Sequence, residues 1–217
     1  MSNRGRIVLI SGPSGSGKTT LHKRLLESPA LKGQLVKSIS ATTRGKRPGE
    51  KNGRDYLFLT PKMFGYKVRR GQFLEWQKVF GNSYGTPKRQ VRALLKKGVH
   101  VLLCIDVKGA RVVWGQFPQA LRIFIKTPSM KVLRERLTRR ASENHETLGL
   151  RLKVARRELK EARHYDHVVV NGRLDHAARD LERIVSRELG VEPRVKRRCR
   201  NAALRRGGHA PLRGIVH

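Results

Sequence analysis

Residues 12–19 read Gly12-Pro13-Ser14-Gly15-Ser16-Gly17-Lys18-Thr19, and they directly follow the apolar run Ile7–Ile10. This segment fits the pattern G-x-x-x-x-G-K-[ST], a glycine-rich turn between a buried strand and a helix. Its glycines let backbone N–H groups point at a phosphate, the lysine adds a positive charge, and the threonine hydroxyl of Thr19 can bind Mg²⁺. The residues predicted to bind the donor phosphates are Gly12, Pro13, Ser14, Gly15, Ser16, Gly17, Lys18, Thr19 and Thr20.

Length and composition limit the class of protein. The chain has 217 residues, of which 38% are hydrophobic, which suits one compact α/β domain with insertions. No apolar run approaches the ~20 residues of a membrane span, and residues 1–6 lack the apolar stretch of a signal peptide. Cys104 and Cys199 lie far apart, so neither a disulfide framework nor a zinc site is indicated. We expect a cytoplasmic protein without a membrane partner.

Short apolar runs alternate with helical patterns along most of the chain, as expected of strands buried on both faces of a parallel sheet. The predicted strands are Ile7–Ile10, Leu35–Ile39, Val99–Ile105, Leu121–Ile125 and Val168–Val170. The predicted helices are Lys18–Glu27, Pro87–Lys97, Ser129–Arg140, Thr147–Arg163 and Leu174–Leu189, with Ser129 as an N-cap. The expected fold class is therefore α/β, a phosphate-loop core with a parallel sheet flanked by helices.

The segment from Ser40 to Pro87 has a different pattern. It is rich in glycine and proline, and it contains the short aromatic strands Asp55–Leu59 and Phe73–Trp76 but little long helix. These features predict an inserted subdomain of mixed β-structure.

The formal net charge is +33, from 49 Lys and Arg against 16 Asp and Glu. Such a charge favours binding to polyanions, which include nucleic acids and highly charged phosphate substrates. Residues 190–217 are strongly basic and have too little apolar surface to fold, so we expect a flexible tail. Nonspecific contact of this tail with nucleic acid is the partner that the charge predicts.

The insertion carries a family resemblance. Residues 40–56 read SATTRGKRPGEKNGRDY and are followed by Phe73-Leu74-Glu75-Trp76 and by residues 81–87, GNSYGTP. With the phosphate loop and the later arginines, this ordered set resembles the guanylate kinases over residues 4–189. The resemblance implies a core (4–39 and 88–189), a GMP-binding insertion (about 40–87) and a small lid (about 140–150). It also implies Mg²⁺-dependent transfer of the ATP γ-phosphoryl group to GMP and dGMP, giving ADP and GDP in purine nucleotide recycling.

The resemblance also assigns an acceptor site. A GMP phosphate is mostly a dianion near neutral pH, so the reaction needs positioning and positive charge rather than a general base. Guanine presents two donors, N1–H and the exocyclic amine, which one carboxylate can accept. By resemblance, Glu75 reads the guanine with Ser40 and Thr86. The remaining GMP-binding residues implied are Arg44, Arg47, Glu50, Tyr56 and Tyr84.

The last set implied by the resemblance acts on the transferring phosphoryl group. Arg136 and Arg140 are four residues apart and so share a helical face at the entrance to the lid, and Arg151 follows it. The catalytic residues predicted are Lys18, Arg44, Arg136, Arg140 and Arg151. Asp106 is expected to hold Mg²⁺ through water, beside Thr19.

Three positions depart from the family pattern. Cys104 stands where the family usually has an acid, Lys108 where it usually has glutamine, and Asn171-Gly172-Arg173 replaces Asn-Asp-Asp. Three alternatives to a fully active GMP kinase follow: a kinase of the same scaffold for another phosphorylated acceptor such as a ribose phosphate, a noncatalytic module that binds phosphopeptides, and a nucleic-acid-binding protein. The complete phosphate loop and the set Ser40, Glu75 and Thr86 argue against the first two.

Overall fold

The core is a five-stranded parallel sheet in the order β2-β7-β1-β8-β9. The computed structural model describes residues 5–140 and 145–191. The strands are β1 (Ile7–Ser11), β2 (Leu35–Lys37), β7 (His100–Cys104), β8 (Leu121–Lys126) and β9 (His167–Val170). All of their pairings are parallel, which confirms the predicted α/β fold class.

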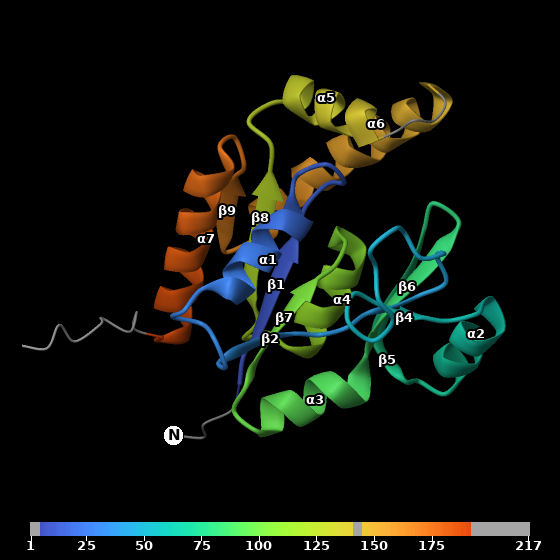
Figure 1. Cartoon of the computed structure of the whole chain (residues 1–217), viewed down its shortest axis with the longest axis vertical. Helices are drawn as coiled ribbons and strands as arrows, with labels where there is room; N and C mark the ends of the chain where they lie inside the picture. Colours follow the sequence, from blue (N-terminus) through green and yellow to red (C-terminus); the bar gives the residue numbers. More distant parts are fainter. Residues whose placement is uncertain (1–4, 141–144, 192–217) are drawn as a thin grey trace, which may run out of the picture.

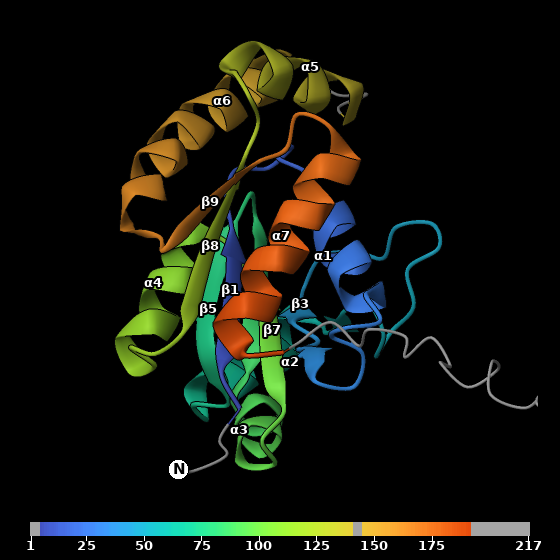
Figure 2. The same ribbon diagram turned by 90° about the vertical axis from the view of Figure 1, so that its left-hand side faces the viewer.

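Helices cover both faces of this sheet (Figures 1 and 2). On one face, α1 (Lys18–Glu27) and α7 (Leu174–Leu189) pack with Val8 and Ile10 of β1 in one hydrophobic cluster. On the other face, α3 (Lys88–Lys96) and α4 (Val107–Gln116) pack with Ile7 and Leu9. Successive residues of β1 therefore point to opposite faces, and both sets are buried, which explains the continuous apolar run in the sequence.

The insertion forms a separate four-stranded sheet in the order β4-β3-β6-β5. Its strands are β3 (Ala41–Thr42), β4 (Leu57–Phe58), β5 (Phe73–Val79) and β6 (Asn82–Pro87). β3 pairs parallel to β4 and antiparallel to β6, so the sheet is mixed, as predicted. As expected, the insertion contains little long helix: α2 (Pro61–Arg69), which the sequence analysis did not place, spans nine residues. Its start has an ordinary sequence signal, since Thr60 Oγ1 accepts a hydrogen bond from the Met63 N–H at 3.2 Å and Pro61 occupies the first turn.

The sequence analysis also missed α4. Asp106 begins this helix as its N-cap, and its Oδ1 accepts a hydrogen bond from the Gly109 N–H at 2.7 Å. Two glycines and three valines lower its intrinsic helix propensity, so burial against the sheet rather than local preference forms it.

The helices of the proposed lid region are α5 (Met130–Arg140) and α6 (His145–Lys160), which is followed by the 3₁₀ helix η1 (Glu161–His164). The predicted N-cap is confirmed, since Ser129 Oγ accepts a hydrogen bond from the Val132 N–H at 3.3 Å. The centre of the predicted lid, residues 141–144, lies outside the described residues.

The core continues slightly beyond α7. Gly190 ends the helix in a left-handed conformation, with φ of 65°, and Val191 then packs against the core with 6% of its surface exposed. The rest of the predicted tail, residues 192–217, lies outside the described residues. Among the described helices, none combines the length and apolar character needed to cross a bilayer.

Candidate active site

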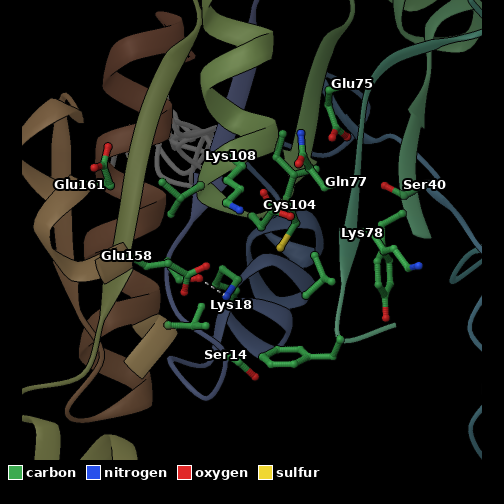
Figure 3. Close-up of a pocket in the computed structure, with 18 of the residues that line it drawn as sticks. Ser14, Lys18, Ser40, Glu75, Gln77, Lys78, Cys104, Lys108, Glu158 and Glu161 are labelled. Atoms are coloured by element: carbon green, nitrogen blue, oxygen red, sulfur yellow. Dashed lines mark hydrogen bonds between the residues drawn. The ribbon is translucent and has the colours of Figure 1, made fainter. Parts of the chain in front are cut away.

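A cavity of about 610 Å³ lies where the carboxyl ends of the core strands face the insertion. It brings the phosphate loop, the insertion and α6 together, although these segments lie far apart in the sequence (Figure 3). The predicted site residues that line it are Gly12, Ser14, Gly15, Gly17, Lys18, Thr19, Ser40, Tyr56, Glu75, Tyr84, Asp106 and Arg151. Thr86 is buried and bonded to Glu75. Among the described side chains, the other predicted residues that do not line the cavity are Pro13, Ser16, Thr20, Arg44, Arg47, Glu50 and Arg136.

The phosphate loop requires glycine at two positions. Gly12 has a φ of 141°, and a Cβ there would lie 2.0 Å from the Ile125 carbonyl oxygen. Gly17 has a φ of 91°, and a Cβ there would lie 2.1 Å from Asn171 Nδ2. That same amide donates a hydrogen bond to the Ser16 carbonyl at 2.8 Å, so Asn171 supports the loop from behind.

Lys18 is folded back onto the phosphate loop. Its Nζ donates hydrogen bonds to the Gly12 carbonyl at 2.5 Å and to the Pro13 carbonyl at 2.9 Å. The Glu158 carboxylate of α6 points toward Lys18 across the cavity (Figure 3). Burial raises the pKa of Glu158 to about 7, while the nearby Lys18 charge opposes this rise. The sequence analysis missed Glu158, because one acid within a basic helix gives no sign that it faces the phosphate loop.

The predicted guanine-reading residues form a buried pair. Glu75 lies on β5 with 6% of its surface exposed, and its Oε1 accepts a hydrogen bond from Thr86 Oγ1 of β6 at 2.6 Å. Ser40 lines the same cavity (Figure 3). Burial raises the pKa of Glu75 to about 7, and the Asp106 charge adds to the rise. The buried carboxyl group thus lines the cavity, and its second oxygen, Oε2, is not bonded to Thr86.

Gly109 of α4 makes room for that carboxyl group. A Cβ at Gly109 would lie 2.5 Å from Glu75 Oε2 and 3.0 Å from its Cδ. We therefore expect Gly109→Ala to displace the Glu75 carboxylate and raise the KM for GMP about tenfold, equivalent to about 1.4 kcal/mol. Steady-state kinetics with varied GMP measure this effect.

Gly115→Ala is the matched control, because Gly115 lies on the same helix and a Cβ there would meet nothing within 4 Å. The control should keep the wild-type KM and gain up to about 1 kcal/mol of stability from helix propensity. Equal KM values for both variants would show that Gly109 does not position Glu75.

The residues predicted to hold the acceptor phosphate form a network within the insertion. Arg44 Nη2 donates to both carboxylate oxygens of Glu50, at 2.8 and 3.0 Å, and the Arg47 N–H donates to Glu50 Oε2 at 2.9 Å. Although partial burial opposes it, the Arg44 hydrogen bond holds the pKa of Glu50 below its ordinary value. The Tyr56 and Tyr84 rings meet edge to face at 6.2 Å. Glu50 therefore orients the Arg44 guanidinium and fixes the backbone at Arg47, a more specific arrangement than the sequence indicated.

Lys37 is a second residue that the sequence analysis missed. Its Nζ lies 3.4 Å from the Asp55 carbonyl oxygen and 5.7 Å from the centroid of the Tyr56 ring, while the Arg44 guanidinium lies 5.5 Å from the same ring. Burial lowers the pKa of Lys37, and interaction with Cys104 and Asp55 opposes this change. Nothing in the sequence indicates that a lysine at the end of this short strand lies beside Tyr56.

The arginines of α5 and α6 approach the cavity from the side of the phosphate loop. Arg136 Nη2 donates a hydrogen bond to the Asn171 carbonyl at 2.9 Å, behind the loop. Arg151 lines the cavity, with its guanidinium 5.5 Å from the ring centroid of Phe80 at the β5–β6 turn. The side chain of Arg140 lies outside the described part of the chain.

Cys104 ends β7 and lies in the cavity near Lys18 (Figure 3), and Asp106, the N-cap of α4, lines the same cavity. Burial raises the pKa of the Cys104 thiol, while Lys18 and Lys37 oppose the rise. Within the described residues, no group of three or more His, Cys, Asp or Glu side chains could hold a metal. The oxygens of Thr19 and Asp106 in this cavity do suit Mg²⁺, which commonly takes one or two protein oxygens, waters and substrate phosphates.

The chain is similar to known proteins over most of its length. The guanylate kinase family model matches residues 4–188. A guanylate kinase from Rubrobacter xylanophilus is 42% identical over 184 residues, which cover 85% of this chain and 95% of that protein. Another from Dechloromonas aromatica is 42% identical over 200 residues, covering 92% and 96%.

A solved structure extends the similarity to the fold. The crystal structure of guanylate kinase from Anaplasma phagocytophilum matches with a TM-score of 0.70 and 34% identity, covering 86% of this chain and 87% of that one. The resemblance that the insertion motifs predicted is thereby confirmed. From the matching family model, the relatives and the shared fold together, this chain belongs to the guanylate kinase family.

Proposed function

We propose that this protein transfers the γ-phosphoryl group of ATP to GMP or dGMP, giving ADP and the corresponding diphosphate. The observation that carries the proposal is that Glu75 and the phosphate loop line one cavity, so a guanine acceptor and a donor phosphate are brought together. Membership of the family makes the chain an ATP-dependent nucleoside-monophosphate kinase. A coupled assay of ADP formation with GMP, dGMP, AMP, CMP and UMP tests the acceptor. Turnover should be confined to the two guanine nucleotides.

The donor side consists of the loop amides, Lys18 and Thr19. Because Lys18 Nζ bonds to the carbonyls of Gly12 and Pro13, it would turn outward to reach the donor phosphates. Glu158 stands beside it and would stabilise the ammonium group during that change. Thr19 and Asp106 would hold Mg²⁺, the latter through water, and the ion supplies charge neutralisation between the donor phosphates.

On the acceptor side the guanidinium groups of Arg44 and Arg47 and the hydroxyls of Tyr56 and Tyr84 would bind the GMP phosphate. Glu50 fixes Arg44, so part of the ordering cost is met before GMP binds. The attacking oxygen belongs to a phosphate that is already mostly ionised, and no side chain needs to remove a proton.

Phosphoryl transfer then depends on positive charge around the oxygens of the moving group. We assign this role to Lys18, Arg136, Arg140 and Arg151, with Arg44 at the acceptor. Arg136 and Arg151 come from α5 and α6, the two helices that flank residues 141–144. A movement of these helices toward the cavity would bring the arginines onto the phosphates and exclude water.

Cys104 gives the first test of how far this chain departs from its family. An aspartate at this place would face Lys18 and Lys37, which both act on the thiol electrostatically. We expect Cys104→Asp to raise kcat or to lower the Mg²⁺ concentration needed, by about 1–2 kcal/mol if one charge-assisted hydrogen bond is gained. Steady-state kinetics across a Mg²⁺ titration measure it. A variant slower at every Mg²⁺ concentration would mean that the site has adapted to the thiol.

The alternative activities have less support. A phosphopeptide-binding module needs no phosphate loop, whereas here Asn171 and Arg136 hold a complete one. The cellular role that follows from the proposed reaction is purine nucleotide recycling in the cytoplasm.

Contact with nucleic acid through the basic residues 190–217 remains a separate proposal, which rests on charge alone. Truncation should follow Val191, because that side chain is buried in the core. The truncated protein should keep GMP turnover within about twofold and lose salt-sensitive retention of RNA, since each phosphate contact contributes roughly 0.7–0.9 to the log-log salt slope. Unchanged retention would place any such contact on the folded core instead.

A further inference from the structure

A second cavity, of about 530 Å³, lies between α2 and α3, and we call it the cationic groove. Both helices contact β5, and Figure 1 shows α3 at the base of the core and α2 at the outer side of the insertion. Four basic side chains line the groove: Lys67, Lys88, Arg89 and Arg92. The volume falls in the range of about 300–1,000 Å³ that small-molecule sites occupy.

The charge of the groove is unbalanced. Glu75 is the only acidic residue in the sequence from Pro61 to Lys97, and it faces the other cavity. Within residues 5–140 and 145–191, no ion pair includes any of the four basic side chains of the groove. Lys67 is oriented by a neutral partner, since its Nζ donates to Gln72 Oε1 at 3.0 Å. The groove therefore concentrates positive charge that the described part of the protein does not neutralise.

Its floor is apolar. The floor consists of side chains from the small hydrophobic cluster of the insertion, Ala41, Leu57, Leu59 and Phe73, together with Pro87. A ligand that fits both parts carries phosphate groups for the basic side chains and a flat apolar group for the floor. Arginine suits the first task, because its planar fork can hold two phosphate oxygens at once.

The groove lies on the opposite face of the insertion sheet from the candidate active site. Three pairs of neighbouring residues divide between the two faces. Ser40 and Tyr56 line the active-site cavity, whereas the residues that follow them, Ala41 and Leu57, line the groove. In the third pair Thr86 bonds to Glu75, and Pro87 lines the groove. Successive residues of a strand point to opposite faces, which explains the division. A ligand in the groove would therefore contact the same strands that hold the guanine-reading residues.

We infer that the cationic groove is a second ligand site, which takes a phosphorylated small molecule with a flat apolar group, as a nucleotide has. Because residues of β5 and β6 line both cavities, its occupancy is expected to change the KM for GMP. The binding test below does not use catalysis, so its result is independent of the proposed function.

The test compares the full chain with two double variants of equal charge. Arg89→Gln with Arg92→Gln alters the groove, and Arg179→Gln with Arg187→Gln alters exposed arginines of α7 on the far side of the core. Titration calorimetry with tripolyphosphate, and separately with UTP, at about 0.15 M salt measures the number of anions bound. We expect the groove variant to bind about one equivalent fewer than the wild type and the control.

The two probes separate the sources of binding. Equal affinity for both would mean that the groove recognises phosphate alone, and tighter binding of UTP by about tenfold would show that the base is also held. Equal stoichiometry in all three proteins would overturn the site. A single-stranded oligonucleotide is titrated as a third probe. If the groove variant loses binding of the oligonucleotide but keeps binding of tripolyphosphate and UTP, the groove is a nucleic-acid surface and the small-molecule assignment is overturned. The coupling is tested separately, by measuring the KM for GMP with and without tripolyphosphate in the groove variant and in the control. If tripolyphosphate changes the KM equally in both variants, the coupling is contradicted.

Discussion

Lys18→Ala is expected to reduce the kcat for GMP phosphorylation on the order of 10²–10³-fold, the usual loss when one charged group that stabilises a transition state is removed. The binding of GMP should be almost unchanged, because the groups proposed to hold it come from the insertion. Steady-state kinetics give kcat, and titration of the protein with GMP in the absence of ATP gives the Kd for GMP.

Lys23→Ala is the matched control, because Lys23 lies on α1 as well but is exposed. The control should keep both constants. If Lys18→Ala weakened GMP binding as strongly as it slowed turnover, the division between a donor loop and an acceptor insertion would be wrong.

The second large effect is expected at Glu75. Glu75→Gln keeps the shape of the side chain but turns one acceptor oxygen into an NH₂ donor, which would face the donors of guanine. The kcat/KM for GMP should fall by about 30- to 900-fold, on the order of 2–4 kcal/mol for a buried mismatch with a charged group. Selectivity for GMP over AMP should fall with it. A variant that keeps the selectivity of the wild type would remove Glu75 from guanine recognition.

We expect the affinity for GMP to depend on pH through the ionisation of Glu75. In the free protein burial raises the pKa of Glu75 to about 7, so below that pH the carboxyl group is protonated. Guanine presents donors, which favour the ionised form. Affinity for GMP should therefore increase as the pH rises through about 7 and level off above it.

The phosphate of GMP also titrates, with a pKa near 6, and this changes the affinity of the wild type and of Glu75→Gln for GMP alike. The ratio of KM values for Glu75→Gln and wild type is thus the informative quantity, measured from about pH 5.5 to 8.5. It should rise with pH. A ratio that stays constant would show that Glu75 does not change its ionisation over this range.

The regular parts of the core could be predicted from the sequence because local and tertiary preferences agree there. The predicted range of α1 matches the structure, and the apolar run of β1 is buried on both faces. α4 could not be predicted in the same way, since Gly109 and Gly115 lower its local preference and packing against the sheet forms it. A glycine is present at position 109 despite its low helix propensity because its lack of a side chain leaves space for the Glu75 carboxyl group.

The site was predicted in part for a similar reason. Motifs of fixed spacing identify Lys18 and Glu75, but they do not show which residues meet across the cavity. Glu158 lines it from α6, and Lys37 of β2 lies beside the Tyr56 ring, through contacts that only the fold defines. Nor does spacing distinguish a residue that binds from one that orients, and Glu50 is bonded to Arg44 rather than open to the cavity.

The central claim is that this cavity passes phosphate from ATP to a guanine nucleotide. The most direct measurement follows the label from γ-³²P-ATP in the full chain supplied with GMP and AMP at equal concentrations. The account predicts that the label appears in GDP. Label in ADP instead, or label that remains in ATP, would contradict it.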